Sequence, residues 1–310
     1  MTDGHPIGRA GRGYLNRFLV VSNAAAGSSH GDRVAAAVEV LRAGAEVREE
    51  RSDGPADLER ILRDRGDATV VIAGGDGSVH AAVAALRRLA ALHPGSPLGL
   101  IPLGTGNDLA RTLGVPLDPE QAARVVMAGR PRRLDLVVDD AGGVVVNAVH
   151  LGIGAEAAAR ASDLKDRLGP TAYAVGSAVA GLTERGWALR VEADGEVLQG
   201  PDERVLMVAV ANGRTIGGGA ELAPDADPGD GLLDVVVARS TGPVARLGFG
   251  VTLRSGDHVH RADVTVTRAS TVRVSGEPFP LNADGELAGP VPARSWALEP
   301  GAWSVISPPA

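Results

Sequence analysis

Residues 68–78, ATVVIAGGDGS, decide the fold of the amino-terminal half of this chain. The first six residues are apolar or small except for Thr69, which predicts a strand buried on both faces of a parallel sheet. The glycines that follow predict a turn, and a helix is expected to begin at Ser78. The same order of strand, glycine turn and helix returns in residues 98–108, LGLIPLGTGND. Two such units in succession indicate an α/β domain.

The flanking sequence extends this pattern towards the amino terminus. Strands are predicted at Phe18–Ser22 and Ala45–Arg51, and helices with one apolar face at Arg33–Arg42 and Asp57–Arg63. We therefore predict a three-layer α/β domain over residues 17–133. Residues 1–16 lack the apolar stretch of a signal peptide, so we interpret them as a disordered arm.

From Leu134 onward the pattern changes to short strands separated by turn residues. These strands are predicted at Leu134–Val138, Val144–Val149, Leu189–Ala193, Val205–Ala211, Leu233–Ala238, Val264–Thr267 and Thr271–Val274. Helical patterns persist only at Ala155–Arg167, Tyr173–Glu184 and Val244–Arg254. We predict a β-rich, sandwich-like domain over residues 134–295, and a last segment, residues 296–310, that returns to the first domain.

The composition narrows the functional classes. A length of 310 residues with 44% hydrophobic residues suits two packed domains. The absence of cysteine excludes disulfides and thiolate metal sites and agrees with a cytoplasmic location. A net charge of −7 argues against a nucleic-acid partner. No segment has the roughly 18–20 apolar residues that cross a bilayer, so any substrate held in a membrane would have to be met by peripheral contact with the inner membrane surface. Whether the chain forms a homodimer is left open.

The first glycine turn is a candidate phosphate site. Gly74, Gly75 and Gly77 allow the backbone to approach an anion, and the N–H groups that open the next helix point towards it. Asp76 suits such a loop if its carboxylate holds Mg²⁺, because the metal screens the phosphates. The alternative is an ordinary turn in which Asp76 caps the helix.

The second glycine turn repeats this arrangement one unit later. Thr105 can donate a hydrogen bond to a phosphate, and Gly104 and Gly106 permit close approach. Asn107 or Asp108 is expected to cap the following helix and to face the site. Because neighbouring parallel strands end at the same edge of their sheet, the two turns predict one ligand site there.

These blocks, GGDGS (74–78) and PLGTGNDLAR (102–111), resemble those of the diacylglycerol kinase catalytic family. The resemblance continues through NAVHLGIGAE (147–156), LAPDADPGDGLLDV (222–235) and LNADGE (281–286), in the same order, so that it spans residues 18–290. It implies a soluble bacterial lipid kinase that uses ATP and Mg²⁺. Its active site would lie in the cleft between an α/β nucleotide domain and a β-sandwich.

The resemblance also implies roles for individual residues. Those expected to contact ATP are Asn23, Gly75, Asp76, Gly77, Ser78, Val79, His80, Ala81 and Thr105. A structural Mg²⁺ is expected at the carboxylate of Asp230 and the backbone carbonyls of Asp227 and Leu232, and Asp135 matches an acidic residue of a metal–water network. Lys165, the single lysine of the chain, falls on a lysine position associated with the active site.

The late block NADGE is expected to supply the proton acceptor. Phosphoryl transfer to a hydroxyl needs a group that takes the proton and cations that spread charge. In a β-segment Asp284 and Glu286 would share a face, so that one accepts the lipid hydroxyl proton while the other holds metal or water. The resemblance assigns the base to this pair, and Glu286 is our first choice. The alternative is an Asp-Gly hairpin turn with a solvated carboxylate.

Three departures from the family pattern concern the phosphate loop. Ser78 replaces a threonine, His80-Ala81 replaces Asn-Glu, and Ser28 replaces a basic residue. His80 can serve as a donor, but its helical position favours a surface histidine. His150, within an apolar strand, is expected to be a satisfied core histidine.

The predicted function is transfer of the ATP γ-phosphoryl group to a lipid hydroxyl, on a diacylglycerol-like or sphingoid lipid. An NAD kinase shares a similar glycine loop and two-domain plan and is the alternative enzyme. A nucleotide- or lipid-binding protein without turnover is the non-enzymatic alternative, motivated by the altered residues 78–81.

Overall fold

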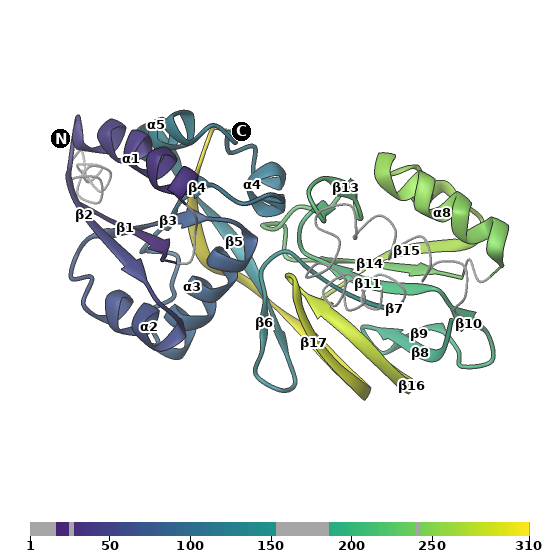
Figure 1. The fold of residues 1–310 in the computed structure, drawn as a ribbon. Helices are drawn as coiled ribbons and strands as arrows, with labels where there is room; N and C mark the ends of the chain where they lie inside the picture. Colours follow the sequence, from purple (N-terminus) through teal and green to yellow (C-terminus); the bar gives the residue numbers. More distant parts are fainter. Residues whose placement is uncertain (1–16, 25–27, 153–185, 240–241, 310) are drawn as a thin grey trace, which may run out of the picture.

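The computed structural model describes residues 17–24, 28–152, 186–239 and 242–309, with the side chains of residues 28–30 and 243 left aside. Figure 1 shows two lobes joined by long strands. The predicted arm, Lys165 and the predicted helices at 155–167 and 173–184 lie outside the described residues.

The first lobe is built on a parallel sheet whose strand order is β2-β1-β3-β4. Its strands are β1 (Arg17–Asn23), β2 (Glu46–Ser52), β3 (Thr69–Gly74) and β4 (Gly99–Pro102). Every residue of β3 before Gly74 is buried, as its apolar composition predicts. The carboxyl ends of β1 and β3 lie side by side, which places the segment after Asn23 next to the GGDGS loop.

Helices cover both faces of this sheet. They are α1 (Ser28–Arg42), α2 (Pro55–Arg63), α3 (Asp76–Arg88), the short α4 (Asp108–Thr112) and α5 (Pro119–Ala128). Val20 and Val71 pack with α1 and α5, whereas Val70 and Ile72 pack with α2 and α3, because successive strand residues point to opposite faces. The three-layer α/β prediction is confirmed.

The second lobe contains a large sheet, and the described residues contribute eleven strands to it. They are β5 (Arg130–Asp139), β6 (Val144–Val145), β7 (Ala148–Gly152), β8 (Trp187–Ala193), β9 (Glu196–Gln199), β10 (Arg204–Val205), β11 (Met207–Ala211), β14 (Leu233–Ala238), β15 (Val264–Ala269), β16 (Thr271–Ala283) and β17 (Glu286–Ser307). A small sheet pairs β12 (Thr215–Ile216) with β13 (Ala220–Glu221). Helix α8 (Pro243–Ser255) and the 3₁₀ helix η2 (Asp257–His260) lie beside them. The second half is therefore rich in β-structure, as predicted.

The predicted strand at 144–149 is divided into β6 and β7. Between them the backbone N–H groups of Val146 and Asn147 donate to the carboxylate of Asp284 instead of to a neighbouring strand. An apolar run cannot reveal this interruption, because the acceptor is a side chain more than a hundred residues away.

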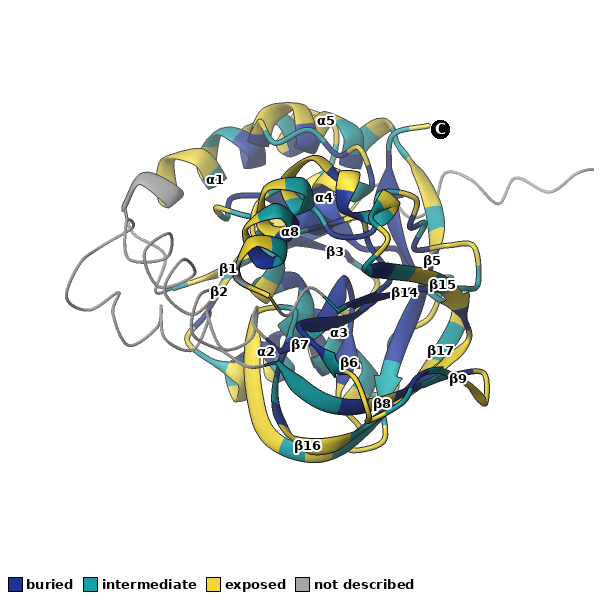
Figure 2. Ribbon diagram, turned by 90° about the vertical axis from the view of Figure 1, so that its right-hand side faces the viewer, coloured by how far each residue is buried: buried dark blue, intermediate teal, exposed yellow. Residues whose placement is uncertain are grey.

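Strands β5 and β17 form an antiparallel ribbon that enters both lobes. At one end Trp296 packs in the core of the second lobe, and at the other Trp303 and Val305 pack in the core of the first. The backbone of Leu98, just before β4, bonds to Ser304 and Ile306. Figure 2 shows buried strands in the interior, β3 and β14 among them, while the outer helix faces are exposed. The segment after Trp296 thus completes the first core.

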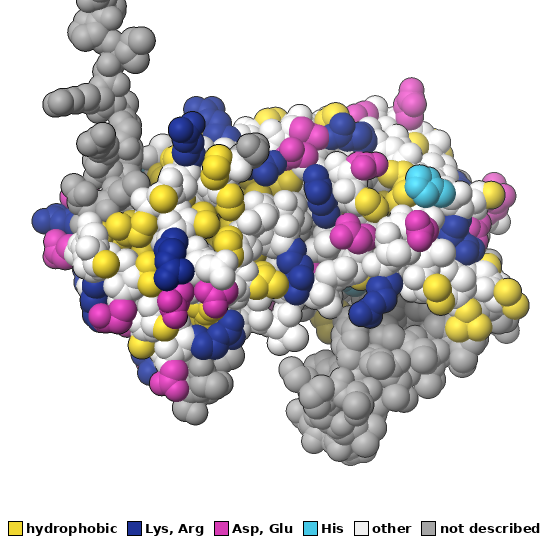
Figure 3. All heavy atoms as spheres, turned by 90° about the horizontal axis from the view of Figure 1, so that it is seen from above, with side chains coloured by type: hydrophobic (Ala, Val, Ile, Leu, Met, Phe, Trp, Pro, Cys, Tyr) yellow, Lys and Arg dark blue, Asp and Glu magenta, His cyan; other side chains and the backbone are white. Residues whose placement is uncertain are grey.

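The surface is mixed in charge. Figure 3 shows acidic and basic side chains intermingled over one face of the molecule, which agrees with the modest net charge of −7. Within the described ranges, no helix is both long and apolar enough to span a membrane.

Candidate nucleotide-binding and active site

A cavity of about 340 Å³ lies at the carboxyl ends of β1 and β3. Asn23, Gly74, Gly75 and Ser78, all predicted nucleotide contacts, are among the residues that line it. This edge of a parallel sheet is where α/β proteins bind their ligands. Val79 lies in the apolar core and Ala81 packs against it, so their side chains support the loop rather than face the cavity.

The two glycine turns touch each other through their backbones. A Cβ on Gly75 would lie 2.9 Å from the Gly104 Cα, and one on Gly104 would lie 2.6 Å from the Gly75 Cα. The second turn is braced by Asn107, whose amide oxygen accepts from the Gly104 N–H at 2.9 Å and whose amide nitrogen donates to the Gly104 carbonyl at 2.7 Å. Glycine is therefore required at both contact positions, and Thr105 is left exposed at the tip of its turn.

Asp76 joins the first turn to helix α4. Its Oδ1 accepts the Leu109 N–H at 3.1 Å, so Asp76 caps α4. The predicted cap by Asn107 or Asp108 is wrong, because both side chains bond elsewhere. Burial raises the pKa of Asp76, and the carboxylates of Asp108 and Asp284 add to this, while the N–H groups at the start of α4 oppose it.

Asp108 is directed towards the second lobe. Its carboxylate accepts from the Thr215 hydroxyl at 2.9 Å and from the N–H groups of Gly218 and Gly219 at 3.0 and 2.9 Å. Both Asp76 and Asp108 lie against Gly106, where a Cβ would come within 2.9 Å and 3.2 Å of their Oδ2 atoms. The filled acceptors of Asp108 hold the lobes together and leave it poorly suited to a nucleotide.

The NADGE block forms a hairpin turn. Asp284 and Gly285 have φ values of 50° and 96°, and Ala283 pairs with Glu286 across the turn. The prediction that Asp284 and Glu286 share the face of one continuous strand is wrong, because the chain reverses between them. Glu286 is exposed, and its side chain makes no hydrogen bond to the described residues.

Asp284 is not a solvated turn carboxylate. Its side chain is 2% exposed. It accepts the N–H groups of Val146, Asn147 and Ala148 at 2.6, 2.9 and 3.0 Å. These donors, together with the contact from His80, occupy its oxygens, so Asp284 anchors the hairpin beside helix α3.

His80 makes the other contact to Asp284. Its Nδ1 lies 2.9 Å from Asp284 Oδ2, and its side chain is 19% exposed. The expectation of a surface histidine is therefore wrong. The hydrogen bond to Asp284, helped by the charges of Asp284 and Glu286 and opposed by burial, raises the pKa of His80. A spacing of four residues places Asp76 and His80 on one face of α3, which is the signal in the sequence that could have found this contact.

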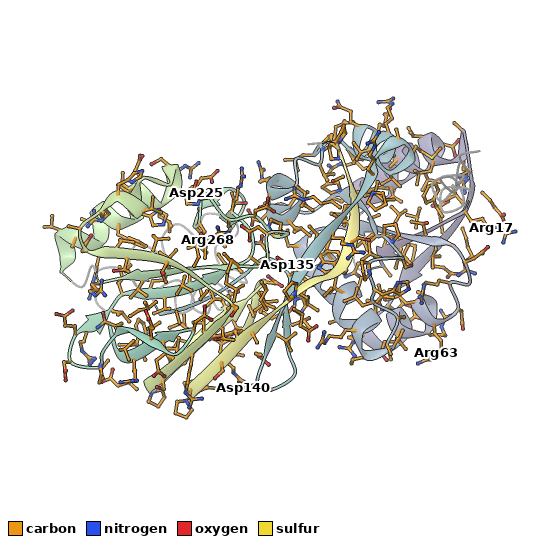
Figure 4. The ribbon with its side chains drawn as sticks, turned by 180° about the vertical axis from the view of Figure 1, so that it is seen from behind. Arg17, Arg63, Asp135, Asp140, Asp225 and Arg268 are labelled. Atoms are coloured by element: carbon orange, nitrogen blue, oxygen red, sulfur yellow. The ribbon has the colours of Figure 1, made fainter. Side chains whose placement is uncertain are left out.

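The predicted structural metal residues are occupied by protein donors. Asp135 accepts the N–H groups of Gly231 and Gly301 at 2.8 and 2.7 Å. The Asp230 carboxylate is bound by Arg268, and that of Asp227 by Arg132. Figure 4 shows Asp135 where the lobes join and Arg268 in the second lobe.

In the described part of the chain, no cluster of three or more carboxylates or histidines is arranged to hold a metal. Arg268 binds the Asp230 carboxylate, and the backbone carbonyl of Asp227, a predicted ligand, accepts the Asp230 N–H at 3.3 Å. The structural Mg²⁺ at Asp230, Asp227 and Leu232 stays a prediction. Leu232 takes part through its N–H, which donates to Asp230 at 3.0 Å.

His150 lies on β7 opposite Asn282 of β16. Burial lowers the pKa of His150 to about 4, so its ring is neutral at physiological pH. His150 is half-buried, and its Nδ1 has no hydrogen-bond partner among the described residues, so the expected satisfied core histidine is not found.

Comparison with known proteins agrees with this arrangement. Residues 17–138 match the diacylglycerol kinase catalytic domain, and residues 147–307 match the YegS C-terminal NAD kinase beta sandwich-like domain. A diacylglycerol kinase of Mycobacterium tuberculosis is 35% identical over 254 residues, which cover 79% of this chain and 78% of that protein. A probable YegS-like lipid kinase of Stenotrophomonas maltophilia is 34% identical over 268 residues, which cover 82% and 83% of the two chains.

Solved structures share the fold. A putative diacylglycerol kinase from Bacillus anthracis has a TM-score of 0.75 at 22% identity, with 94% of this chain and 97% of that chain covered. Yeast NADH kinase complexed with NADH has a TM-score of 0.51 at 13% identity, with 96% and 85% covered. The predicted sandwich-like second domain is thereby confirmed. From the two domain matches and the identities of 34–35% over most of its length, this chain belongs to the diacylglycerol kinase catalytic family.

Proposed function

We propose that this protein is an ATP-dependent lipid kinase that transfers the γ-phosphoryl group to a hydroxyl of a diacylglycerol-like or sphingoid lipid. The observation that carries the proposal is the meeting of two features at one sheet edge. The cavity beside GGDGS lies next to the contact between the lobes, where Asp76 and His80 of the first lobe lie near Asp284 of the hairpin in the second.

The triphosphate is placed on the backbone of Gly75 and Gly77, since the Ser78 N–H already donates to the Gly75 carbonyl at 3.0 Å. Helix α3 begins there and is 13 residues long, so its free N–H groups and its dipole favour an anion. Asn23, at the end of the neighbouring strand β1, also lines the cavity and adds a polar contact.

Asp76 fits a nucleotide-bound Mg²⁺. One Asp76 oxygen accepts the Leu109 N–H at the start of α4. The nearby carboxylates of Asp108 and Asp284 add negative charge around Asp76. A divalent cation would relieve the repulsion between these carboxylates, so the Asp76 carboxylate is a suitable ligand for Mg²⁺. When bound, Mg²⁺ would supply charge neutralisation for the phosphates.

Glu286 is the proposed general base. The Glu286 carboxylate makes no hydrogen bond to the described residues, whereas the Asp284 oxygens accept several. We therefore assign Asp284 to positioning the hairpin and His80. The lipid hydroxyl oxygen forms a bond to the γ-phosphorus while the bond to the β–γ bridging oxygen breaks. The hydroxyl proton passes to Glu286, and ADP leaves.

Contact with a lipid surface has its own support in α8. Val244, Leu247 and Val251 lie on one side of this helix and are 84%, 60% and 74% exposed. Helix α8 has no acidic residue, which suits an interface with anionic lipid. The protein is accordingly expected to act peripherally on membrane lipids and to sediment with anionic vesicles.

The test is incubation with labelled ATP, Mg²⁺ and vesicles that contain diacylglycerol, a sphingoid base or total lipid extract, followed by identification of the product. NAD is included as an acceptor, because yeast NADH kinase shares the fold. Phosphorylated NAD with no lipid product would replace this function by the NAD kinase alternative. ATP binding with no product from any acceptor would favour the non-catalytic alternative.

For the chemical step, Glu286→Gln is expected to lower turnover by about two to four orders of magnitude, the usual scale for loss of a general base. ATP affinity by calorimetry should stay nearly unchanged. Glu196→Gln, on the exposed edge of β9, is the matched control and should keep full activity. Retention of more than about a third of the turnover by Glu286→Gln would transfer the role to Asp76, whose raised pKa suits a base.

A further inference from the structure

The cavity wall opposite the GGDGS loop is formed by strand β2. Two charged residues of this strand, Glu49 and Arg51, line the cavity. Glu49 is ion-paired with Arg42 of α1, with an Oε1–Nη2 distance of 2.6 Å. Arg42 also pairs with Glu39 at 2.9 Å, so the negative charge of Glu49 is balanced only in part from within the first lobe.

Arg51, in contrast, has no ion-pair partner among the described residues. It lies two residues beyond Glu49, so both side chains leave β2 on the same face of the sheet, the face covered by α1. Arg51 is exposed, and no hydrogen bond or ion pair joins it to the described residues. Among the described residues that line the cavity it is the one cation. Arg51 therefore lines, without a partner among the described residues, a cavity whose other lining residues are glycines, small polar residues, apolar side chains and the ion-paired Glu49.

The strand order fixes where Arg51 stands relative to the glycine loop. Arg51 is paired in register with Ser22 of β1, and Ser22 in turn is paired with Ala73 of β3, the residue before Gly74. The three positions form a row across the ends of three parallel strands. Arg51 closes one end of this row and the GGDGS loop closes the other, so a ligand in the cavity lies between them.

We propose that Arg51 binds a phosphate group of the nucleotide from the wall opposite GGDGS. The inference rests on the proposed nucleotide site and names a residue outside every motif of the sequence. The loop offers neutral N–H donors, and a polyphosphate needs positive charge as well. The planar fork of arginine can donate two parallel hydrogen bonds to a phosphate, which a lysine cannot reproduce.

The test is titration calorimetry of the whole protein with Mg·ATP and, separately, with adenosine. A hydrogen bond to a charged group is worth about 1.5–3 kcal/mol, so Arg51→Gln is expected to raise the Kd for Mg·ATP about 10- to 150-fold. Adenosine lacks phosphate, and its affinity should change less than about twofold on the same grounds. Arg51→Lys should recover part of the ATP affinity, because it restores charge without the fork.

Arg63→Gln is the matched control, since Arg63 is also an exposed arginine without a partner in the described structure but lies on α2, away from the cavity. It should bind like wild type. An Arg51→Gln protein that binds ATP as tightly as the control overturns the inference alone. An equal loss for adenosine would place Arg51 on the base or ribose and also overturn it. Wild-type protein that binds no ATP would overturn the proposed function and this inference with it.

Discussion

For Asp284, the sequence motif identifies a residue of the site but not the hydrogen-bond partners that determine its role. The block NADGE identifies an acidic residue of the site, but its donors are backbone groups 136–138 residues earlier and a histidine 204 residues earlier. The same holds for Asp108, which bonds to residues more than a hundred positions later. Spacing along the chain carries no record of such partners, so the residues were predictable and their roles were not. Arg51 belongs to no motif at all.

The contact between His80 and Asp284 makes stability depend on pH. The hydrogen bond raises the pKa of His80 above its ordinary value of 6.5. The contribution to the free energy of unfolding is therefore fully present below about pH 6.5 and is lost as pH rises through the higher folded-state pKa. His80→Asn should accordingly destabilise the protein more at pH 6 than at pH 9 in urea unfolding.

His93→Asn is the control for this measurement, because His93 makes no contact with a carboxylate in the described residues and its Nδ1 accepts the Gly95 N–H. Its effect should not vary with pH in the same range. A His80→Asn penalty of equal size at both pH values would show that the charged form of His80 is not what Asp284 stabilises.

The helices and strands predicted from local sequence patterns agree with the structure more closely in the first lobe than in the second. The apolar strand before GGDGS and the amphipathic α2 are long enough for their period to be read. Helix α5 was missed because alanines make up much of its buried face, and alanine gives a weak periodic signal. Asp-Gly is a strong turn signal, and the chain does reverse at Asp284-Gly285, so at this position the local rule describes the structure better than the expected continuous strand.

The packing of the two glycine turns can be tested at the level of the loops. In Gly104→Ala the new Cβ would lie 2.6 Å from a backbone atom of the first turn, which cannot move aside cheaply. We expect a loss of about 1–3 kcal/mol in the free energy of unfolding and weaker ATP binding.

Gly77→Ala provides the comparison, since a Cβ there would meet nothing within 4 Å and the backbone φ is not positive. Its stability should match or slightly exceed wild type. If Gly77→Ala keeps its stability but loses ATP affinity, a ligand occupies the space above that glycine. Equal stability of both variants would mean that the turns do not constrain each other.

At the scale of the whole molecule, the link from Asp108 to the 215–219 segment holds the two lobes against each other. A double-mutant cycle isolates it: Asp108→Ala, Thr215→Val and the double variant, each followed by urea unfolding. The hydroxyl-to-carboxylate bond of 2.9 Å is buried at both ends, so we expect a coupling of about 1.5–3 kcal/mol. Additive effects of the two substitutions would remove this bond from the forces that join the lobes.

The ribbon of β5 and β17 has a consequence for the order in which the chain folds during synthesis. The core of the amino-terminal lobe includes Trp303 and Val305, and Leu98 finds its backbone partners at 304 and 306. Domains commonly fold as they leave the ribosome, amino-terminal domain first. Here the earlier lobe must wait, with one flank of its sheet uncovered, until nearly three hundred further codons after Phe18 have been translated. The growing polypeptide is therefore expected to depend on nascent-chain chaperones for most of its elongation, and to commit to its final shape only when β17 arrives.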